Sequence, residues 1–472
     1  MSERIVLALS GDQYACLQDC LFPGDGFEAV ALLLCGHRRG DRRHRVVVRE
    51  VHGIPYDECT VRSPTKVTWH PDYVAPLLER AADEGLAVIK VHSHPSGYAA
   101  FSETDDRGDR ELLPMISGWL ESCQVVGSVV MLPDGQMFGR VLDQDRSFRP
   151  IDCISVAADD LLFWYSDAGS LELPSFVASH AQAFDEGTIE RLQRLSIGVV
   201  GASGTGSPLI EQLMRLGVGE IVIVDDDLME DRNVNRIVNS TACDAAKNRP
   251  KVEVLSDAIR RADLGTKVVP ISENLWNPEV VRSIAQCDVL FGCMDSVDGR
   301  FLLNAISAYY CIPYFDIGVR LVAGPAKEGS AEISEVCGTI HYLRPGRSSL
   351  ISRELFSMQD VAEAGLRRND PEAHGQQVRD GYIRGAEGHR PAVISVNMFA
   401  SSLAVNEFLA RIHPYREEPN EMYAETTFSL ASMELFYEPE VGICPILGGK
   451  AGYGDVTPLL NLLELAEARP SC

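Results

Sequence analysis

Two histidines one residue apart, His92 and His94, are followed by Ser102 and Asp105. The apolar run Leu86–Val91 predicts a strand before them, and residues i and i+2 of a strand face the same side. Both imidazoles can therefore bind one metal ion, and Asp105 can supply a third ligand. Two histidines and one carboxylate leave a fourth zinc position open for water, as in a catalytic site. A nearby carboxylate must then take the proton from that water.

Each part of this pattern also has an ordinary explanation. A histidine pair on a strand is commonly a matter of packing, and Ser102 with Asp105 could be a helix N-cap and a first-turn acid. Seven residues separate His94 from Ser102, and two separate Ser102 from Asp105. This joint spacing favours the metal site.

A second group of residues could bind phosphate. Three glycines and a helical pattern separate two apolar runs, in the order Ile197–Val200, Gly201, Gly204, Gly206, Pro208–Leu216 and Ile221–Val224. Strand, glycine turn, helix and strand predict the first unit of a doubly wound nucleotide-binding sheet. The glycines let backbone N–H groups approach a phosphate, and Asp225 after the second run could bind ribose hydroxyls. The glycine order alone leaves NAD and ATP both open.

Composition narrows the class of protein. The chain has 472 residues, enough for two or three domains, and 45% of them are hydrophobic. A net charge of −25 argues against nucleic-acid and anionic-membrane partners. The 13 cysteines include no C-x-x-C pair, which is typical of a reducing cytosol. We expect no signal peptide and no membrane span, and a cytoplasmic protein.

The elements that would position these residues form two domains and a linker. We expect an α+β domain over residues 1–150, a linker with lead-in helices over 151–185, and an α/β domain over 186–472. The patterns predict strands and helices in the first domain, at Phe27–Cys35, Arg45–Val51, His70–Gly85 (helix), Leu86–Val91, Glu103–Leu113 (helix), Val125–Met131 and Met137–Val141. In the second domain they predict further helices at Gly187–Leu195 and Val393–Ile412.

The first motif resembles H-x-H-x7-S-x-x-D of the JAMM (MPN) metallopeptidases, the zinc isopeptidases of ubiquitin systems. Glu28, before an ALLLCG run, matches the upstream glutamate of that family. The resemblance implies a cytidine-deaminase-like fold in which His92, His94 and Asp105 bind Zn²⁺. It also implies that Glu28 is the general acid/base and that Ser102 is an oxyanion donor.

The second motif continues beyond the glycines. Asp225, Asp227, Glu230, Asn233 and Arg236 resemble the D-x-D-x-V-E-x-x-N-L-N-R signature of the ThiF/HesA/MoeB and ubiquitin-activating adenylyltransferases. This implies a Rossmann-like domain with a mixed, mostly parallel sheet, and it favours ATP over NAD. By the same resemblance, Asp225 and Asp227 serve the ribose side, while Asn233 and Arg236 approach the phosphates.

Two further positions follow from this resemblance. Lys251 occupies the place of a second phosphate-binding cation, after a slightly long loop. Asp295 follows the apolar run Val289–Cys293 and matches the Mg²⁺-binding aspartate, with Arg300 and Asn304 after it. The leaving pyrophosphate gains charge when the α-phosphate is attacked, which is why a pair of cations is needed.

The sequence also departs from this family. Relatives hold a structural zinc with two C-x-x-C pairs, of which only Cys444 is retained here, so we predict no zinc in this domain. No cysteine lies between Cys337 and Cys444, where the crossover loop brings the nucleophile in thioester-forming relatives. The acyl-adenylate would pass directly to an acceptor, or a serine would accept it as an oxyester. The candidates for that serine are Ser348, Ser349, Ser352 and Ser357, and we carry Ser349 forward.

Together the resemblances imply an enzyme that adenylates the C-terminus of a ubiquitin-like protein. The fused peptidase would process or deconjugate the same protein, in a bacterial conjugation or defence pathway. A conjugating enzyme is a further expected partner. We also expect a homodimer, because relatives form homodimers in which an arginine reaches the other subunit's ATP. Residues 179–182 contain no arginine at that place.

Three alternatives remain open from the sequence. The first is activation of a sulfur carrier or a peptide, and the second is a dinucleotide-dependent oxidoreductase. The third is a non-catalytic scaffold that binds the carrier, which the lost cysteine favours. Arg236, Lys251 and Asp295 argue against a scaffold, because a scaffold does not need a phosphate site.

Overall fold

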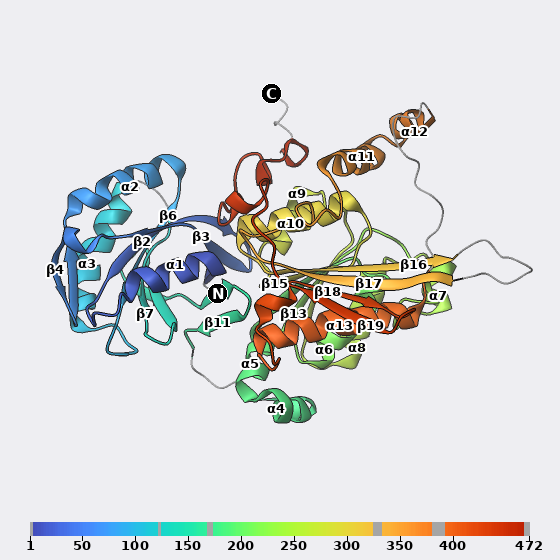
Figure 1. Cartoon of the computed structure of the whole chain (residues 1–472), viewed down its shortest axis with the longest axis horizontal. Coiled ribbons are helices and arrows are strands. Elements are labelled where there is room, and N and C mark those ends of the chain that lie inside the picture. Colours follow the sequence, from blue (N-terminus) through green and yellow to red (C-terminus); the bar gives the residue numbers. More distant parts are fainter. Residues whose placement is uncertain (1–2, 121–123, 168–172, 324–332, 380–391, 467–472) are drawn as a thin grey trace, which may run out of the picture. The chain divides into compact units, whose positions relative to one another are not determined.

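The computed structural model describes residues 3–120, 124–167, 173–323, 333–379 and 392–466. The chain forms two units (Figure 1), which are described separately. The first unit contains Met1–Gly169, Ala308–Cys311 and Lys450–Asn461, and the second contains Ser170–Ser307, Ile312–Gly449 and Leu462–Cys472.

A nine-stranded mixed sheet forms the centre of the first unit, in the order β11-β10-β1-β3-β2-β6-β7-β8-β9. Its strands are β1 (Arg4–Ser10), β2 (Val30–Arg39), β3 (Arg43–Gly53), β6 (Ala87–Ser93), β7 (Val126–Met131), β8 (Met137–Leu142), β9 (Phe148–Pro150), β10 (Cys153–Ala157) and β11 (Leu161–Tyr165). A separate hairpin pairs β4 (Cys59–Ser63) with β5 (Lys66–Trp69).

Helices cover both faces of this sheet because its central strands are apolar on both sides. Along β2, Ala31 and Leu33 pack in one core with α1 (Gly11–Leu21). The alternate residues, including Leu32, pack in the opposite core with α2 (Pro71–Glu84) and α3 (Glu103–Trp119). The period of two residues therefore divides one strand between two cores.

The predicted elements of this unit are present, with shifted limits. Helix α2 ends where expected, because Gly85 adopts a left-handed conformation with φ of 67°. Strand β2 begins at Val30 rather than Phe27, which leaves Glu28 in the preceding loop. The boundary expected at residue 150 is corrected, because β10 pairs with β1 and β11 pairs with β10 in the first sheet. Both strands lie in the segment predicted to be the linker.

The second unit is built on an eight-stranded sheet, in the order β14-β13-β12-β15-β16-β17-β18-β19. Pairings from β14 to β16 are parallel, and those from β16 to β19 are antiparallel. The strands are β12 (Ser196–Val200), β13 (Glu220–Val224), β14 (Lys267–Ile271), β15 (Val289–Gly292), β16 (Tyr314–Ala323), β17 (Ile333–Leu343), β18 (Glu425–Ser429) and β19 (Glu434–Glu438). The mixed, Rossmann-like arrangement predicted from the sequence is confirmed.

Helices lie on both faces of this second sheet (Figure 1). The helices are α4 (Ala178–Phe184), α5 (Glu186–Arg194), α6 (Gly206–Arg215), α7 (Ala242–Ala246), α8 (Lys251–Ala262), α9 (Pro278–Ile284), α10 (Val297–Tyr310), α11 (Met358–Asn369), α12 (Pro371–Arg379) and α13 (Ile394–Ile412). The long apolar helix predicted near the end is α13, which packs against α6, β16 and β17. None of the helices within the described residues is long and apolar enough to cross a membrane.

Candidate functional site

Three potential metal ligands meet where β6 ends beside the start of α3. His92 Nε2 lies 3.0 Å from Asp105 Oδ1, and His94 Nε2 lies 3.2 Å from Asp105 Oδ2. The two Nε2 atoms are 3.2 Å apart. Ligand atoms roughly 2.0–2.1 Å from a tetrahedral zinc ion would be about 3.3–3.4 Å from one another. The two histidine nitrogens have nearly this spacing, and one ligand atom from each of the three residues lies within 4.8 Å of the others, so the three residues could bind one ion.

The two imidazoles have different surroundings, since His94 Nδ1 has a hydrogen-bond partner and His92 Nδ1 is buried without one. His94 Nδ1 donates to the carbonyl of Tyr98 at 2.7 Å, which leaves the lone pair of Nε2 for a ligand. Burial, followed by the charge of Lys90, lowers the pKa of His92 to about 4. His92 is therefore neutral near pH 7, as a metal-binding histidine must be.

Asp105 and Ser102 also cap α3. Ser102 is the N-cap residue, and its N–H and O–H both donate to Asp105 Oδ2 at 2.7 Å. The N–H of Asp105 donates back to Ser102 Oγ at 3.2 Å. Burial opposes ionisation of Asp105, but the neighbouring His92 and His94 hold its pKa well below the usual range. The capping and metal-binding explanations are therefore compatible, since one carboxylate can do both.

Glu28 is brought to this cluster by the register of β2 and β6. Val30 pairs with His92, so continuing the antiparallel register places Glu28 opposite His94. Its backbone is fixed on both sides, by Arg62 donating to its carbonyl at 3.1 Å and by its own N–H donating to Ser63 at 2.9 Å. Burial raises the pKa of Glu28 to about 7. A carboxyl group with this pKa can both accept and release a proton near neutral pH.

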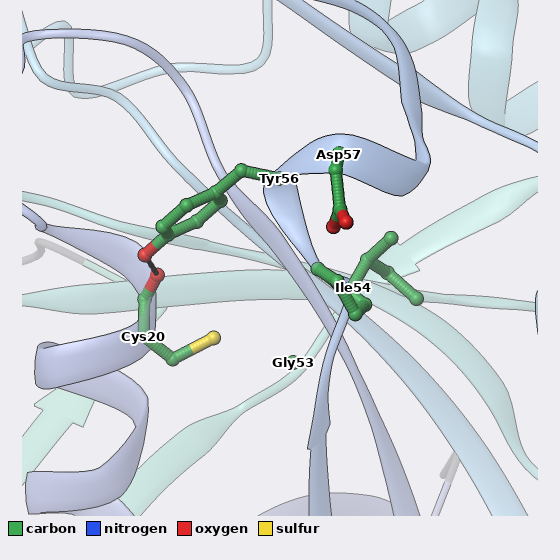
Figure 2. A pocket seen from close by; sticks show the side chains of 6 residues that line it. Cys20, Gly53, Ile54, Tyr56 and Asp57 are labelled. Atoms are coloured by element: carbon green, nitrogen blue, oxygen red, sulfur yellow. Dashed lines mark hydrogen bonds between the residues drawn. The ribbon is translucent and has the colours of Figure 1, made fainter.

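The first unit also contains a pocket, and none of the potential metal ligands lines it. It is lined by Cys20, Gly53, Ile54, Pro55, Tyr56 and Asp57. Figure 2 shows the Tyr56 hydroxyl, which donates to the Cys20 carbonyl at 2.8 Å. The Arg62 guanidinium lies over the Tyr56 ring at 4.1 Å. None of the predicted site residues lines this pocket.

In the second unit, the glycine turn after β12 requires glycine at two positions. Gly201 has φ of 99°, and a Cβ there would lie 2.6 Å from the carbonyl oxygen of Cys293. A Cβ on Gly206 would overlap the carbonyl of Gly201. The turn thus passes close to the neighbouring strand and leads directly into α6, whose first N–H groups lie there. A phosphate cradle of backbone amides needs this close approach.

Asp225 holds the glycine turn against the end of β13. Its Oδ2 accepts from the N–H of Ala202 at 2.7 Å, and its Oδ1 accepts from the N–H of Asp227 at 2.9 Å. Burial raises its pKa, while the charge of Lys251 at 3.7 Å acts in the opposite direction. Asp225 therefore organises the turn, in addition to the ribose role that we predict for it.

The two predicted cations lie at the same edge of the sheet. Lys251, the first residue of α8, is buried and pairs with Asp227 as well as Asp225. The Arg236 side chain passes 3.4 Å from the Cβ position of Gly204. The Asn397 side-chain amide, from α13, lies against the same Cβ position. Asn397 is not predicted from the sequence, because helical spacing gives no sign that this residue reaches a turn almost 200 positions earlier.

Asn233 and Asp295 occupy different environments. Asn233 is buried and accepts from the Glu230 N–H at 2.9 Å, so its side-chain oxygen serves a short helical turn, Asp231–Asn233. Asp295 is exposed and follows β15, which pairs with β12 in parallel. The Asp295 carboxylate offers an oxygen ligand for Mg²⁺, which is usually held by one or two carboxylates together with substrate phosphates.

The interpretation of Ser349 as an acyl acceptor needs correction. Ser349 is buried, and its hydroxyl donates to Cys444 Sγ at 3.0 Å. The same oxygen accepts from the N–H groups of Ile351 and Ser352, both at 3.2 Å. The hydroxyl therefore faces the interior, where a bulky adenylate cannot reach it.

The other three candidate serines also have structural roles. Ser348 is buried and accepts from Arg353 at 2.8 Å, and Ser352 donates to the Ser349 carbonyl at 3.1 Å. Ser357 is exposed and caps α11. Residues 380–391, part of the expected crossover interval, lie outside the described residues.

We expect Ser349→Ala to leave ATP–pyrophosphate exchange, the reaction that the family resemblance implies, unchanged. The loss of three hydrogen bonds should instead lower the free energy of unfolding by about 1–3 kcal/mol. Pyrophosphate exchange and thermal melting on the same preparation check both expectations. A hydroxylamine-labile adduct of the carrier that forms on the parent protein and not on Ser349→Ala would restore the acyl-acceptor interpretation.

Two family models match the chain. The model of the ThiF family matches residues 177–438, more than half of the chain. The model of prokaryotic homologs of the JAB domain matches residues 23–155. The first match contains the glycine turn and both cations, and the second contains Glu28 and the three clustered ligands.

Curated relatives resemble part of the chain. A SAMP-activating enzyme E1 of Haloferax volcanii is 35% identical over 123 residues, which are 26% of this chain and 45% of that protein. The molybdopterin-synthase adenylyltransferase of Escherichia coli is 31% identical over 153 residues, 32% of this chain and 58% of that protein. The ubiquitin-like modifier-activating enzyme 5 of Aedes aegypti is 24% identical over 193 residues, 38% and 45% respectively. The matches span about half the length of these relatives.

Solved structures of E. coli MccB also resemble the chain. One, with MccA-N7isoASN, has a TM-score of 0.43 and 16% identity, covering 59% of this chain and 76% of that chain. Another, with ATP, has a TM-score of 0.40 and 16% identity, covering 59% and 75%.

Proposed function

The chain belongs to the ThiF family and carries a JAB domain before its ThiF domain, and on this basis we propose that it adenylates the C-terminus of a ubiquitin-like protein. In this reaction a carboxylate oxygen of the carrier attacks the α-phosphate of MgATP. A bond forms between that oxygen and phosphorus, the bond from the α-phosphorus to the bridging oxygen breaks, and pyrophosphate leaves. The product is an acyl-adenylate.

The observation that carries this proposal is the gathering of Gly201, Gly204, Gly206, Arg236 and Lys251 at one edge of the sheet. The close turn leaves room for phosphate oxygens beside backbone N–H groups. In our proposal, Arg236 and Lys251 offset the charge that develops on the leaving pyrophosphate, and Asp295 holds Mg²⁺. Lys251 would exchange its contact with Asp227 for one with phosphate.

For the JAB domain we propose zinc-dependent cleavage of the same carrier from its precursor or its conjugates. When bound, the zinc would act as a Lewis acid on the scissile carbonyl and lower the pKa of a water. Glu28 would take the proton from that water and pass it to the leaving amine. Its buried carboxyl group, with a pKa raised to about 7, supports this role, although the charge of a bound metal would lower that value. Ser102 would donate to the developing oxyanion.

A second candidate function is activation of a sulfur carrier. The similarity to the molybdopterin-synthase adenylyltransferase of E. coli is nearly as high as that to the SAMP-activating enzyme. Both candidates share adenylate formation and differ in the acceptor. Incubation of the adenylate with sulfide and with a lysine-containing acceptor distinguishes them, since a thiocarboxylate forms in the first case and an amide in the second.

Carrier-dependent ATP–pyrophosphate exchange with the full chain tests the proposed function. We expect labelled pyrophosphate to enter ATP only when a carrier with a free C-terminal carboxylate is present. Carrier lacking its last residues serves as the control, because it offers no correctly placed carboxylate. Exchange that is absent with every ubiquitin-like protein tested would contradict the proposal, and so would exchange that is independent of carrier.

Removal of the metal should separate the two activities. A zinc chelator is expected to abolish cleavage of a carrier fusion, because the proposed zinc ligands His92, His94 and Asp105 belong to the cleavage site. Pyrophosphate exchange should remain intact in excess Mg²⁺. Adding back Zn²⁺ should restore cleavage. Cleavage that persists after metal analysis shows a zinc-free protein would rule out the proposed peptidase chemistry.

A further inference from the structure

Beside the metal-ligand row, a second polar row crosses β6, β7 and β8. Lys90 pairs with Ser128, and Ser128 pairs with Arg140, so the three side chains lie side by side on one face of the sheet. His92 follows Lys90 by two residues on β6 and belongs to the next row on the same face. The two rows are therefore roughly 6.6–6.8 Å apart along the strand.

Asp109 of α3 bonds to both cations of this row. Its side chain is fully buried, with Oδ1 accepting from Lys90 Nζ. Its Oδ2 accepts from Arg140 Nη2 at 2.7 Å and from Nε at 3.1 Å. Asp109 is one helical turn after Asp105 and on the same face of α3. One helix therefore presents two carboxylates to one sheet, one to the metal row and one to the cation row.

Arg140 has further partners beside Asp109. The Arg140 guanidinium is stacked 3.8 Å from the centre of the Phe101 ring and 4.4 Å from that of Phe148, and it also bonds to Asp106. Ser128 Oγ, which lies between the two cations in this row, is buried without a hydrogen-bond partner. If α3 shifted relative to β8, the bonds between Arg140 and Asp109 would break.

The bonds among Lys90, Asp109 and Arg140 form without a metal. Their contribution to the free energy of unfolding does not by itself explain why they are there. Buried ion pairs are often no more stable than apolar pairs of similar volume, since desolvation offsets the Coulomb attraction. Their bonds are directional, however, and fix the position of a helix more narrowly than apolar packing does. Asp105 must lie within about 0.5 Å of its place to complete a metal site.

We propose that Lys90, Asp109 and Arg140 form a lock that sets α3 on the sheet and holds Asp105 at binding distance from His92 and His94 before the metal arrives. The lock acts through Asp105 and touches neither metal nor substrate, so its members are positioning residues. This proposal rests on the proposed zinc site. It names the residues that hold the metal ligand Asp105 in place before the metal binds.

Zinc affinity of the full chain, measured by competition with a chromophoric chelator, tests this lock. We expect Asp109→Asn to weaken zinc binding by about 10–100-fold, in the range found for residues that orient metal ligands. The double variant Lys90→Met/Asp109→Leu replaces the ion pair by apolar groups. The metal-free double variant should remain folded, because Arg140 keeps its pair with Asp106, and its zinc affinity should still fall at least tenfold. Lys90→Arg, which keeps the charge, should retain most of the affinity.

Spectra and a control distinguish positioning from general stability. Absorption bands of bound Co²⁺ should change in the double variant, since they report ligand geometry. Asp143→Asn removes the pair with Arg149 at 3.2 Å, outside both rows, and should change neither affinity nor spectrum. A double variant that loses less than tenfold in affinity would overturn the lock while the zinc site stands. A parent protein that binds no zinc would overturn the zinc site itself, and the lock with it.

Discussion

Replacement of Arg236 by alanine is expected to lower kcat/KM for carrier-dependent pyrophosphate exchange by about 10²–10³-fold. The Arg236 side chain passes beside Gly204, where a nucleotide phosphate would lie, and its guanidinium is held by the Arg232 carbonyl at 2.6 Å and by Asn235 Oδ1 at 3.2 Å. A cation fixed in this way interacts most strongly with the charge gained in the transition state. We therefore expect most of the loss in kcat rather than in the KM for ATP.

Arg232→Ala is the matched control for that variant. Arg232 lies four residues earlier in the same segment, has a side chain that is 56% exposed, and pairs with Glu230. An exposed pair of this kind contributes little to stability. Exchange should stay within threefold of the parent. Equal losses in the two variants would mean that Arg236 acts only through the folding of this segment.

Glu28→Gln should reduce cleavage of a carrier fusion by about 10²–10⁴-fold and leave one zinc ion bound per chain. Glutamine has the same shape as glutamate and keeps the position opposite His94, but it cannot accept a proton. His92, His94 and Asp105 are unchanged, so the metal should remain. Metal analysis and a cleavage time course on the same sample measure both quantities.

Glu103→Gln provides the comparison for Glu28. Glu103 is an exposed acid in the first turn of α3, close in the chain to Ser102 and Asp105. Glu103→Gln changes the net charge by the same amount as Glu28→Gln, but it keeps the buried carboxyl group of Glu28. Cleavage by this variant should equal that of the parent. If Glu28→Gln cleaves as fast as Glu103→Gln, another group is the base.

Short-range spacing made much of this protein predictable from its sequence. His92 and His94 share one face of a strand by the period of two, and Ser102 and Asp105 lie one helical turn apart, so the ligand cluster depends on few distant contacts. The strand, glycine turn and helix from Ser196 to Arg215 are likewise contiguous. Both family resemblances rest on such local patterns, and both are confirmed by the family models.

The predictions that needed correction depend on contacts between distant residues. Ser349 looked available as a loop hydroxyl, but Cys444, 95 residues later, buries it. Residues 153–165 had no clear pattern of their own, and they form strands because β1 offers an edge for pairing.

The sequence by itself therefore determined which chemical groups the chain carries and on which elements they lie, because period and spacing are local properties of a polypeptide. Only the tertiary structure decided which groups are buried, which face one another and which hold others in place. Glu28 gains its raised pKa from burial, Asn397 reaches Gly204 from α13, and Lys90 meets Asp109 across two elements. Such properties arise when distant segments exclude water together, and no local pattern encodes that.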